Sequence, residues 1–108
     1  MRQYNRIEYN KLCAEFLGYT NTTPTDPDFS IYENEKGITI KGRFYKLLEP
    51  MSMEFDSDWN WTMQVLRKVL TCIEPSSSLR QDIIHFAGTG RHQETVLALW
   101  QFLTSLTS

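Results

Sequence analysis

Cysteine and histidine are scarce in this chain of 108 residues, which has two of each. Cys13 and Cys72 stand too far apart in sequence for the paired ligands of a zinc site, and two cysteines do not make a disulfide framework. Both fall on apolar faces of predicted helices, so free buried thiols are the simpler interpretation, with a Cys13–Cys72 bridge as the alternative. The composition therefore gives no reason to expect a metal or another cofactor.

Long apolar runs are also lacking. No segment approaches the ~20 apolar residues that a membrane span requires. Met1-Arg2-Gln3 leads into polar sequence without the apolar core of a signal peptide. The lack of a membrane span and of a signal peptide predicts a cytoplasmic protein that does not bind a membrane.

An excess of basic charge is missing as well, because the formal net charge is −2 and the basic residues are spread along the chain. Lys41, Arg43 and Lys46 come closest to a cluster. Domains that bind nucleic acid usually carry a basic face or stripe, so the charge argues against nucleic acid as a partner. Binding to phosphates stays open only if these three side chains share one exposed face.

Aromatic residues, by contrast, make up 13% of the chain. Each can bury roughly 150–250 Å². A chain of this length can bury enough surface for one core without disulfides. We therefore expect residues 1–108 to form a single domain.

The first and last helices are predicted from apolar residues that recur with the 3.6-residue helical period. Residues 5–17 carry one such stripe, which Asn5 can cap and which Gly18 can end in the left-handed conformation that glycine favours. Residues 93–107 carry the other stripe, with Trp100 at its edge.

The central helix, residues 59–73, has the clearest pattern in the chain. Asp56 and Asp58 precede it, and aspartate is a residue type that caps helices. Its apolar sector is wide, with Trp59 on the main side and Trp61 on a flank. We therefore expect this helix to contact more than one neighbouring element.

The segment between the first two helices is predicted to be extended. Residues 19–28 are rich in Pro, Asp, Asn and Thr and are typical of a connection. The β-prone runs 29–32 and 38–40 flank a polar loop, 33–37, which is the pattern of a β-hairpin. Residues 46–54 are interpreted as an irregular segment, with a short strand around residues 51–55 as the alternative.

Residues 79–87 fit two structures. Ser78 and Gly88 could bound a short helix, whereas residues 82–87 equally suit a strand. Because a two-stranded hairpin is marginal alone, we favour a strand that joins the hairpin. The predicted fold is therefore α+β: about three helices packed on a small antiparallel sheet, in the order helix, hairpin, helix, strand, helix.

Three pieces of the chain resemble a family of small bacterial and phage proteins. Residues 10–18 (NKLCAEFLG) are similar to its opening NKLIAEFMG, residues 59–69 (WNWTMQVLRKV) to its central WDWLMPVVEKI, and residues 95–103 (TVLALWQFL) to its closing TYNAVVEFI. Asn60 stands where the family has Asp, and Gln64 where it has Pro. The family has no established activity, cofactor or catalytic residue, so the resemblance implies a phage or mobile-element origin and no particular chemistry.

Four titratable residues are the candidates for chemistry. Asp56 and Asp58 form a carboxylate pair, although both are well explained as groups at a helix start. His85 and His92 are the two histidines, and His92 with Glu94 could form an acid–base pair in a solvated first turn. A small-ligand or enzymatic site requires at least three of the four to converge within hydrogen-bonding reach of one point.

Trp61 and Trp100 are the candidate contacts for a partner. A tryptophan at the edge of an apolar stripe is either half-buried core, which is the default, or a binding hot spot. Leu103 and Leu106 of the last helix also need cover, which allows a homodimer.

The favoured function is thus a non-catalytic accessory protein of phage or mobile-element origin that binds another macromolecule, a protein partner above all. The alternative is a small-ligand or enzymatic protein.

Overall fold

A computed structural model describes residues 3–22 and 31–107 of the chain. These ranges contain four α-helices, a short 3₁₀ helix (η1) and a three-stranded antiparallel sheet, which confirms the predicted α+β class. In chain order the elements are α1 (Arg6–Phe16), β1 (Thr20–Asn21), β2 (Tyr32–Ile40), β3 (Arg43–Leu48), η1 (Pro50–Ser52), α2 (Trp59–Cys72), α3 (Ser78–Gly88) and α4 (His92–Thr107).

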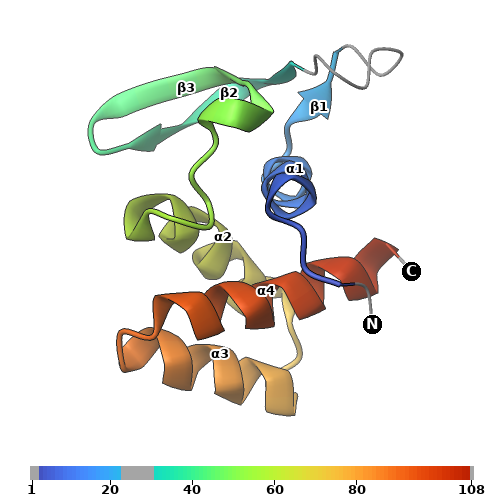
Figure 1. Ribbon diagram of the computed structural model, residues 1–108, viewed down its shortest axis with the longest axis vertical. Coiled ribbons are helices and arrows are strands. Elements are labelled where there is room, and N and C mark those ends of the chain that lie inside the picture. The colour runs from blue at the N-terminus through green and yellow to red at the C-terminus, as the bar shows by residue number, and fades with distance from the viewer. Residues whose placement is uncertain (1–2, 23–30, 108) are drawn as a thin grey trace.

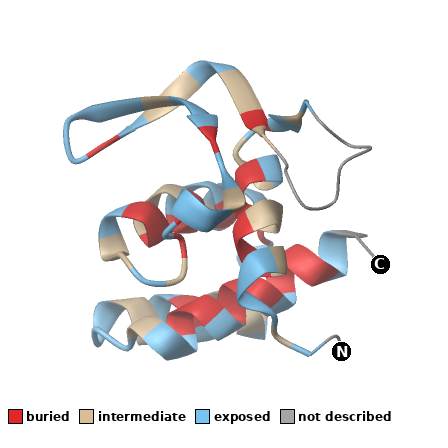
Figure 2. Ribbon diagram, turned by 45° about the horizontal axis from the view of Figure 1, so that its top comes forward, coloured by how far each residue is buried: buried red, intermediate tan, exposed pale blue. Residues whose placement is uncertain are grey.

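The elements are arranged in layers (Figure 1). The sheet lies at one end of the molecule, α1 and α2 lie beneath it, and α4 and α3 follow at the opposite end. α4 packs against the other three helices, and much of its ribbon is coloured as buried (Figure 2). The described helices therefore all lie on one side of the sheet.

Local capping signals predicted the starts of α1 and α2 correctly. The Asn5 side chain accepts a hydrogen bond from the Glu8 backbone N–H at 3.0 Å. The Asp58 carboxylate accepts one from the Asn60 backbone N–H at 2.8 Å. Gly18 follows α1 with a φ of 97°, a left-handed conformation that costs glycine little.

The hairpin turn lies elsewhere than the sequence suggested. β2 runs unbroken through residues 33–37, the predicted loop, and the chain reverses at Lys41 and Gly42. These two residues have φ values of 54° and 79°, as a type I′ turn requires. The prediction was wrong because a polar run ending in glycine is as compatible with an irregular strand as with a loop.

A bulge explains why residues 33–37 looked like a loop. The register of β2 against β3 shifts between Glu33 and Ile38, so the extra residues belong to β2. Gly37 lies in this bulge with a φ of 59°, and the Phe44 ring of β3 covers it. A Cβ at Gly37 would collide with the Phe44 ring and come within 2.9 Å of the Tyr45 carbonyl oxygen, so only glycine fits beneath the ring without a shift.

The third strand is also not the predicted one. Residues 79–87 belong to the helix α3, which buries Ile83 fully and packs along α4. The strand that joins the hairpin is β1, which pairs Thr20 with Glu33 and Asn21 with Tyr32. The helical alternative for residues 79–87 was therefore correct, and the sheet gains its third strand from the predicted connection.

The two cysteines have different environments. Both are free. Cys13 is fully buried, and this burial raises the pKa of its thiol. Cys72 is exposed at the end of α2, which corrects the expectation that both thiols are buried.

Candidate functional site

The start of α2 brings together side chains from α1, the hairpin and α4. Asp56 accepts hydrogen bonds from Arg6 Nε at 2.6 Å and from Asn10 Nδ2 at 3.3 Å. Asp58 accepts one from Lys41 Nζ at 2.5 Å, in addition to capping α2. The hydrogen bond from Lys41 lowers the pKa of Asp58. The two carboxylates therefore have separate cationic partners and hold α1 and the hairpin turn against the helix start.

His92 connects the start of α4 to the start of α2. Its ring stacks on Trp59 with 4.2 Å between ring centroids. Its Nε2 lies 2.7 Å from the Thr62 hydroxyl oxygen, and that hydroxyl donates to the Phe55 carbonyl at 2.8 Å. Trp59 is only half-buried, whereas Thr62 is fully buried, so the buried face of α2 is rotated from the predicted one.

The four titratable candidates do not converge on one point. The effect of Asp56 and Asp58 on the His92 ring is electrostatic: their negative charges raise its pKa. His85 lies exposed on α3, where its ring faces Phe86 at 5.8 Å. Within the described ranges, no group of three or more His, Cys, Asp or Glu side chains is placed to hold a metal ion. The requirement for a shared catalytic or ligand point is therefore not met by these four residues.

The position of His92 makes stability depend on pH. Burial lowers the pKa of His92 below its ordinary value, and this effect outweighs the opposing charges of Asp56 and Asp58. The unfolded chain therefore binds more protons as the pH falls below about 6.5, so the free energy of unfolding should decrease on acidification through this range. Urea unfolding between about pH 7.5 and 5.5, where histidine titrates, measures the slope.

Two histidine variants show whether His92 causes this pH dependence of the free energy of unfolding. His92→Gln should flatten the slope, because it removes the titrating group. His85→Gln changes the exposed histidine of α3, which lies outside this contact, and is the matched control. A slope that survives in His92→Gln would contradict the assignment.

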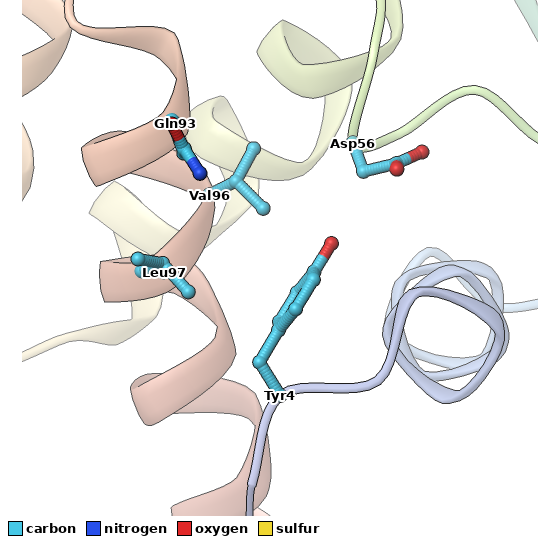
Figure 3. A pocket seen from close by; sticks show the side chains of 5 residues that line it. All are labelled: Tyr4, Asp56, Gln93, Val96 and Leu97. Atoms are coloured by element: carbon cyan, nitrogen blue, oxygen red, sulfur yellow. The ribbon is translucent and has the colours of Figure 1, made fainter.

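A small cavity opens beside Asp56 (Figure 3). It has a volume of about 320 Å³, and the residues that line it are Tyr4, Asp56, Gln93, Val96 and Leu97. The Tyr4 hydroxyl points toward Asp56, and Val96 and Leu97 of α4 form an apolar wall. Partial burial and the nearby carboxylate raise the pKa of Tyr4 to about 12, so its hydroxyl is a neutral donor. The cavity can offer hydrogen bonds and an apolar contact to a small molecule.

The two candidate tryptophans lie in the core. Trp61 is 3% exposed and packs on Phe55 and Tyr45 with 5.0 Å between ring centroids in each pair. Trp100 is 1% exposed and meets the Tyr4 ring edge-on at 5.5 Å. Both take the packing role that was the default, and neither presents a surface to a partner.

The largest exposed apolar side chains include two on β3, which sequence reasoning missed. Phe44 and Leu47 are each 56% exposed, and Arg43 and Lys46 beside them are exposed too. We call these four residues the hairpin surface. β3 is an edge strand of the described sheet, whose order is β1-β2-β3. The three clustered cations of the sequence were the available signal, and they lie in and next to this strand.

The cations of this region are not equivalent. Lys41, Arg43 and Lys46 are all exposed. Lys41 is paired with Asp58, and the guanidinium of Arg43 lies 5.2 Å from the centre of the Tyr45 ring. Arg43 and Lys46 form no ion pair among the described residues.

A scan against protein-family models, a search of curated proteins and a search of solved structures each gave no match to this chain. The resemblance at residues 10–18, 59–69 and 95–103 therefore stays a prediction. Among the described helices, none is both long and apolar enough to cross a membrane.

Proposed function

We propose that this protein is a non-catalytic accessory protein that binds another protein through the hairpin surface. One observation carries the proposal: the edge strand β3 exposes two large apolar side chains, Phe44 and Leu47, at 56% each. Exposed apolar side chains that gather on one element are typical of interaction sites.

The positions of the charged groups support binding rather than catalysis. Asp56, Asp58 and His92 each hold elements together through a different partner. On β3, Phe44 lies against Gly37 and the Arg43 guanidinium lies over the Tyr45 ring, and neither Arg43 nor Lys46 has an ion pair in the described chain. β3 therefore keeps exposed apolar and cationic side chains that another molecule can contact.

A phage or mobile-element origin is supported by the resemblance alone. Three segments of the chain, 10–18, 59–69 and 95–103, resemble those of the family in order and rough spacing. A free edge strand suits the binding of another protein. The homodimer and the cytoplasmic location stay predictions beside it.

Affinity capture from the native host, followed by mass spectrometry, tests the proposal. The wild-type protein should retain a stoichiometric partner, and Leu47→Ser should lose it. Leu106→Ser is a matched control, because Leu106 is also 56% exposed but lies on α4. Absence of any partner, or equal capture by Leu47→Ser and Leu106→Ser, would count against binding through the hairpin.

Small-ligand binding is the second candidate, and the cavity beside Asp56 favours it. The carboxylate there is already paired with Arg6, so the groups left for a ligand are chiefly the Tyr4 hydroxyl and the Gln93 amide. The two candidates depend on different residues: a binding activity lost in Tyr4→Phe belongs to the cavity, and one lost in Leu47→Ser belongs to the hairpin.

A further inference from the structure

If the hairpin surface binds a protein, as proposed above, its charge and its free strand edge indicate the kind of partner. We infer that the partner contributes an extended segment with acidic side chains, which adds to the sheet as a new strand beside β3. Strand addition to a free edge is a common mode of peptide recognition, in which backbone hydrogen bonds give affinity and side chains give specificity.

The register of the hairpin leaves backbone groups free on the outer edge of β3. Ile40 pairs with Arg43 across the two-residue turn, and Thr39 pairs with Phe44. In an antiparallel ladder, successive residues face the neighbouring strand and then the opposite direction. The residues that flank a two-residue turn face each other, so the N–H and C=O groups of Phe44 point away from β2. These two groups are available to another strand.

The opposite edge of the sheet is less accessible. β1 pairs with β2 at Tyr32 and Glu33. Near the other end of β2, the Gln64 side chain donates to the Thr39 carbonyl at 3.5 Å. In the described part of the chain, β3 is therefore the edge that a new strand can reach over most of its length.

The exposed charges on β3 have a single sign. Arg43 and Lys46 are cationic, and the strand from Arg43 to Leu48 contains no acidic residue. Opposite charges on adjacent strands stabilise a sheet, and like charges directly opposite destabilise it. A second copy would bring its own Arg43 and Lys46 to the same edge, whereas a segment with Asp or Glu would be complementary. The charge therefore favours an acidic segment over a homodimer at this edge.

Apolar contacts add to this complementarity. The Phe44 ring rests on Gly37 of β2, which holds an aromatic surface in place at the edge. Leu47 adds a second exposed apolar group one residue beyond Lys46. The expected segment therefore carries both acidic and apolar side chains.

The probe for the test is a blocked peptide of about eight residues, a usual strand length, with alternating Glu and Val. A Lys/Val peptide of the same length is the control for charge. In two-dimensional NMR of the whole chain, the Glu/Val peptide should shift amides of β3 and bind at least about tenfold more tightly than the Lys/Val peptide. Its affinity should fall as salt is added.

Two variants test the backbone pairing. Phe44→Ala and Phe44→Pro both remove the ring, but only proline removes the outward N–H, and proline is tolerated on the free side of an edge strand. Phe44→Ala should bind the Glu/Val peptide weakly, and Phe44→Pro should not bind it. A Glu/Val peptide that is N-methylated along one edge should also fail to bind the wild-type protein, which tests the pairing without changing the protein.

Several outcomes would overturn the inference. Equal binding of the Glu/Val and Lys/Val peptides would refute the charge argument, and equal binding of the methylated peptide would refute strand addition. Concentration-dependent dimers of the peptide-free protein that Phe44→Pro abolishes would make a second copy the occupant. Salt-dependent binding of oligothymidylate at β3 in place of the peptide would assign the surface to nucleic acid. If a captured partner depends on Leu47 but the peptide does not bind, this inference fails while the proposed function stands.

Discussion

Replacing Trp100 with alanine is expected to lower the free energy of unfolding by about 3–5 kcal/mol, the usual cost of truncating a buried Trp. Trp100 is 1% exposed, lies on the helix that packs against the other three, and meets the Tyr4 ring at 5.5 Å. Domains of this kind are stable by only about 5–15 kcal/mol, so the variant should be marginally folded. Urea unfolding followed by far-ultraviolet circular dichroism measures the loss without relying on tryptophan fluorescence.

Two control variants show whether the loss of stability in Trp100→Ala comes from the burial of its ring. Trp100→Phe keeps an aromatic ring against Tyr4 and should lose less stability than Trp100→Ala. Trp59→Ala removes a half-buried tryptophan that stacks on His92, and its cost should also be smaller. A loss below about 1 kcal/mol in Trp100→Ala would contradict its place in the core and return it to the candidates for a partner surface.

The helices were largely predictable because their signals are local. The caps Asn5 and Asp58 act within three residues of their own position, and the apolar stripes repeat within a few turns. The rotation of the buried face of α2 was less predictable. Thr62 is buried because its hydroxyl bonds to the Phe55 carbonyl and contacts His92, and both of these partners come from outside the helix.

The sheet was predicted poorly because its pairing is not local. β1 has only two residues, and its pairing with β2 depends on how α1 delivers the chain to the hairpin. On β3, half-buried Tyr45 and buried Leu48 lie three residues apart, so the alternation breaks opposite the bulge of β2. A strict period of two cannot be recognised where a bulge twists the strand.

The candidate site was likewise predictable where the signals are local and unpredictable where they depend on the assembled sheet. The sequence assigned Asp56 and Asp58 to the start of a helix; Asp58 caps α2, whereas Asp56 accepts hydrogen bonds from Arg6 and Asn10 of α1. The exposure of Phe44 and Leu47 could not be predicted, because it depends on which strand occupies the edge of the sheet. An edge is a property of the assembled topology, and the residues of β3 alone would equally suit an inner strand.

Asn10 is a polar residue whose importance the helical pattern did not reveal. The pattern places it away from the apolar stripe of α1, yet it is 1% exposed. Its side-chain oxygen accepts a hydrogen bond from the Phe55 backbone N–H at 3.0 Å. Its Nδ2 donates to the Arg6 carbonyl at 3.0 Å and to Asp56. Asn10 therefore joins α1 to the segment that leads into α2.

Asn10→Ala should lower the free energy of unfolding by about 2–3 kcal/mol, because it leaves the N–H of fully buried Phe55 without its partner. The matched control is Asp56→Asn, which keeps an acceptor for Asn10 and removes only the ion pair with Arg6. The Arg6 side chain is 51% exposed, so that pair should contribute less than about 1 kcal/mol. Urea unfolding compares the two variants, and hydrogen exchange should show faster exchange of the Phe55 amide in Asn10→Ala alone. Equal losses in the two variants, with an unchanged Phe55 amide, would mean that Asn10 acts through Asp56 and that the buried N–H has another partner.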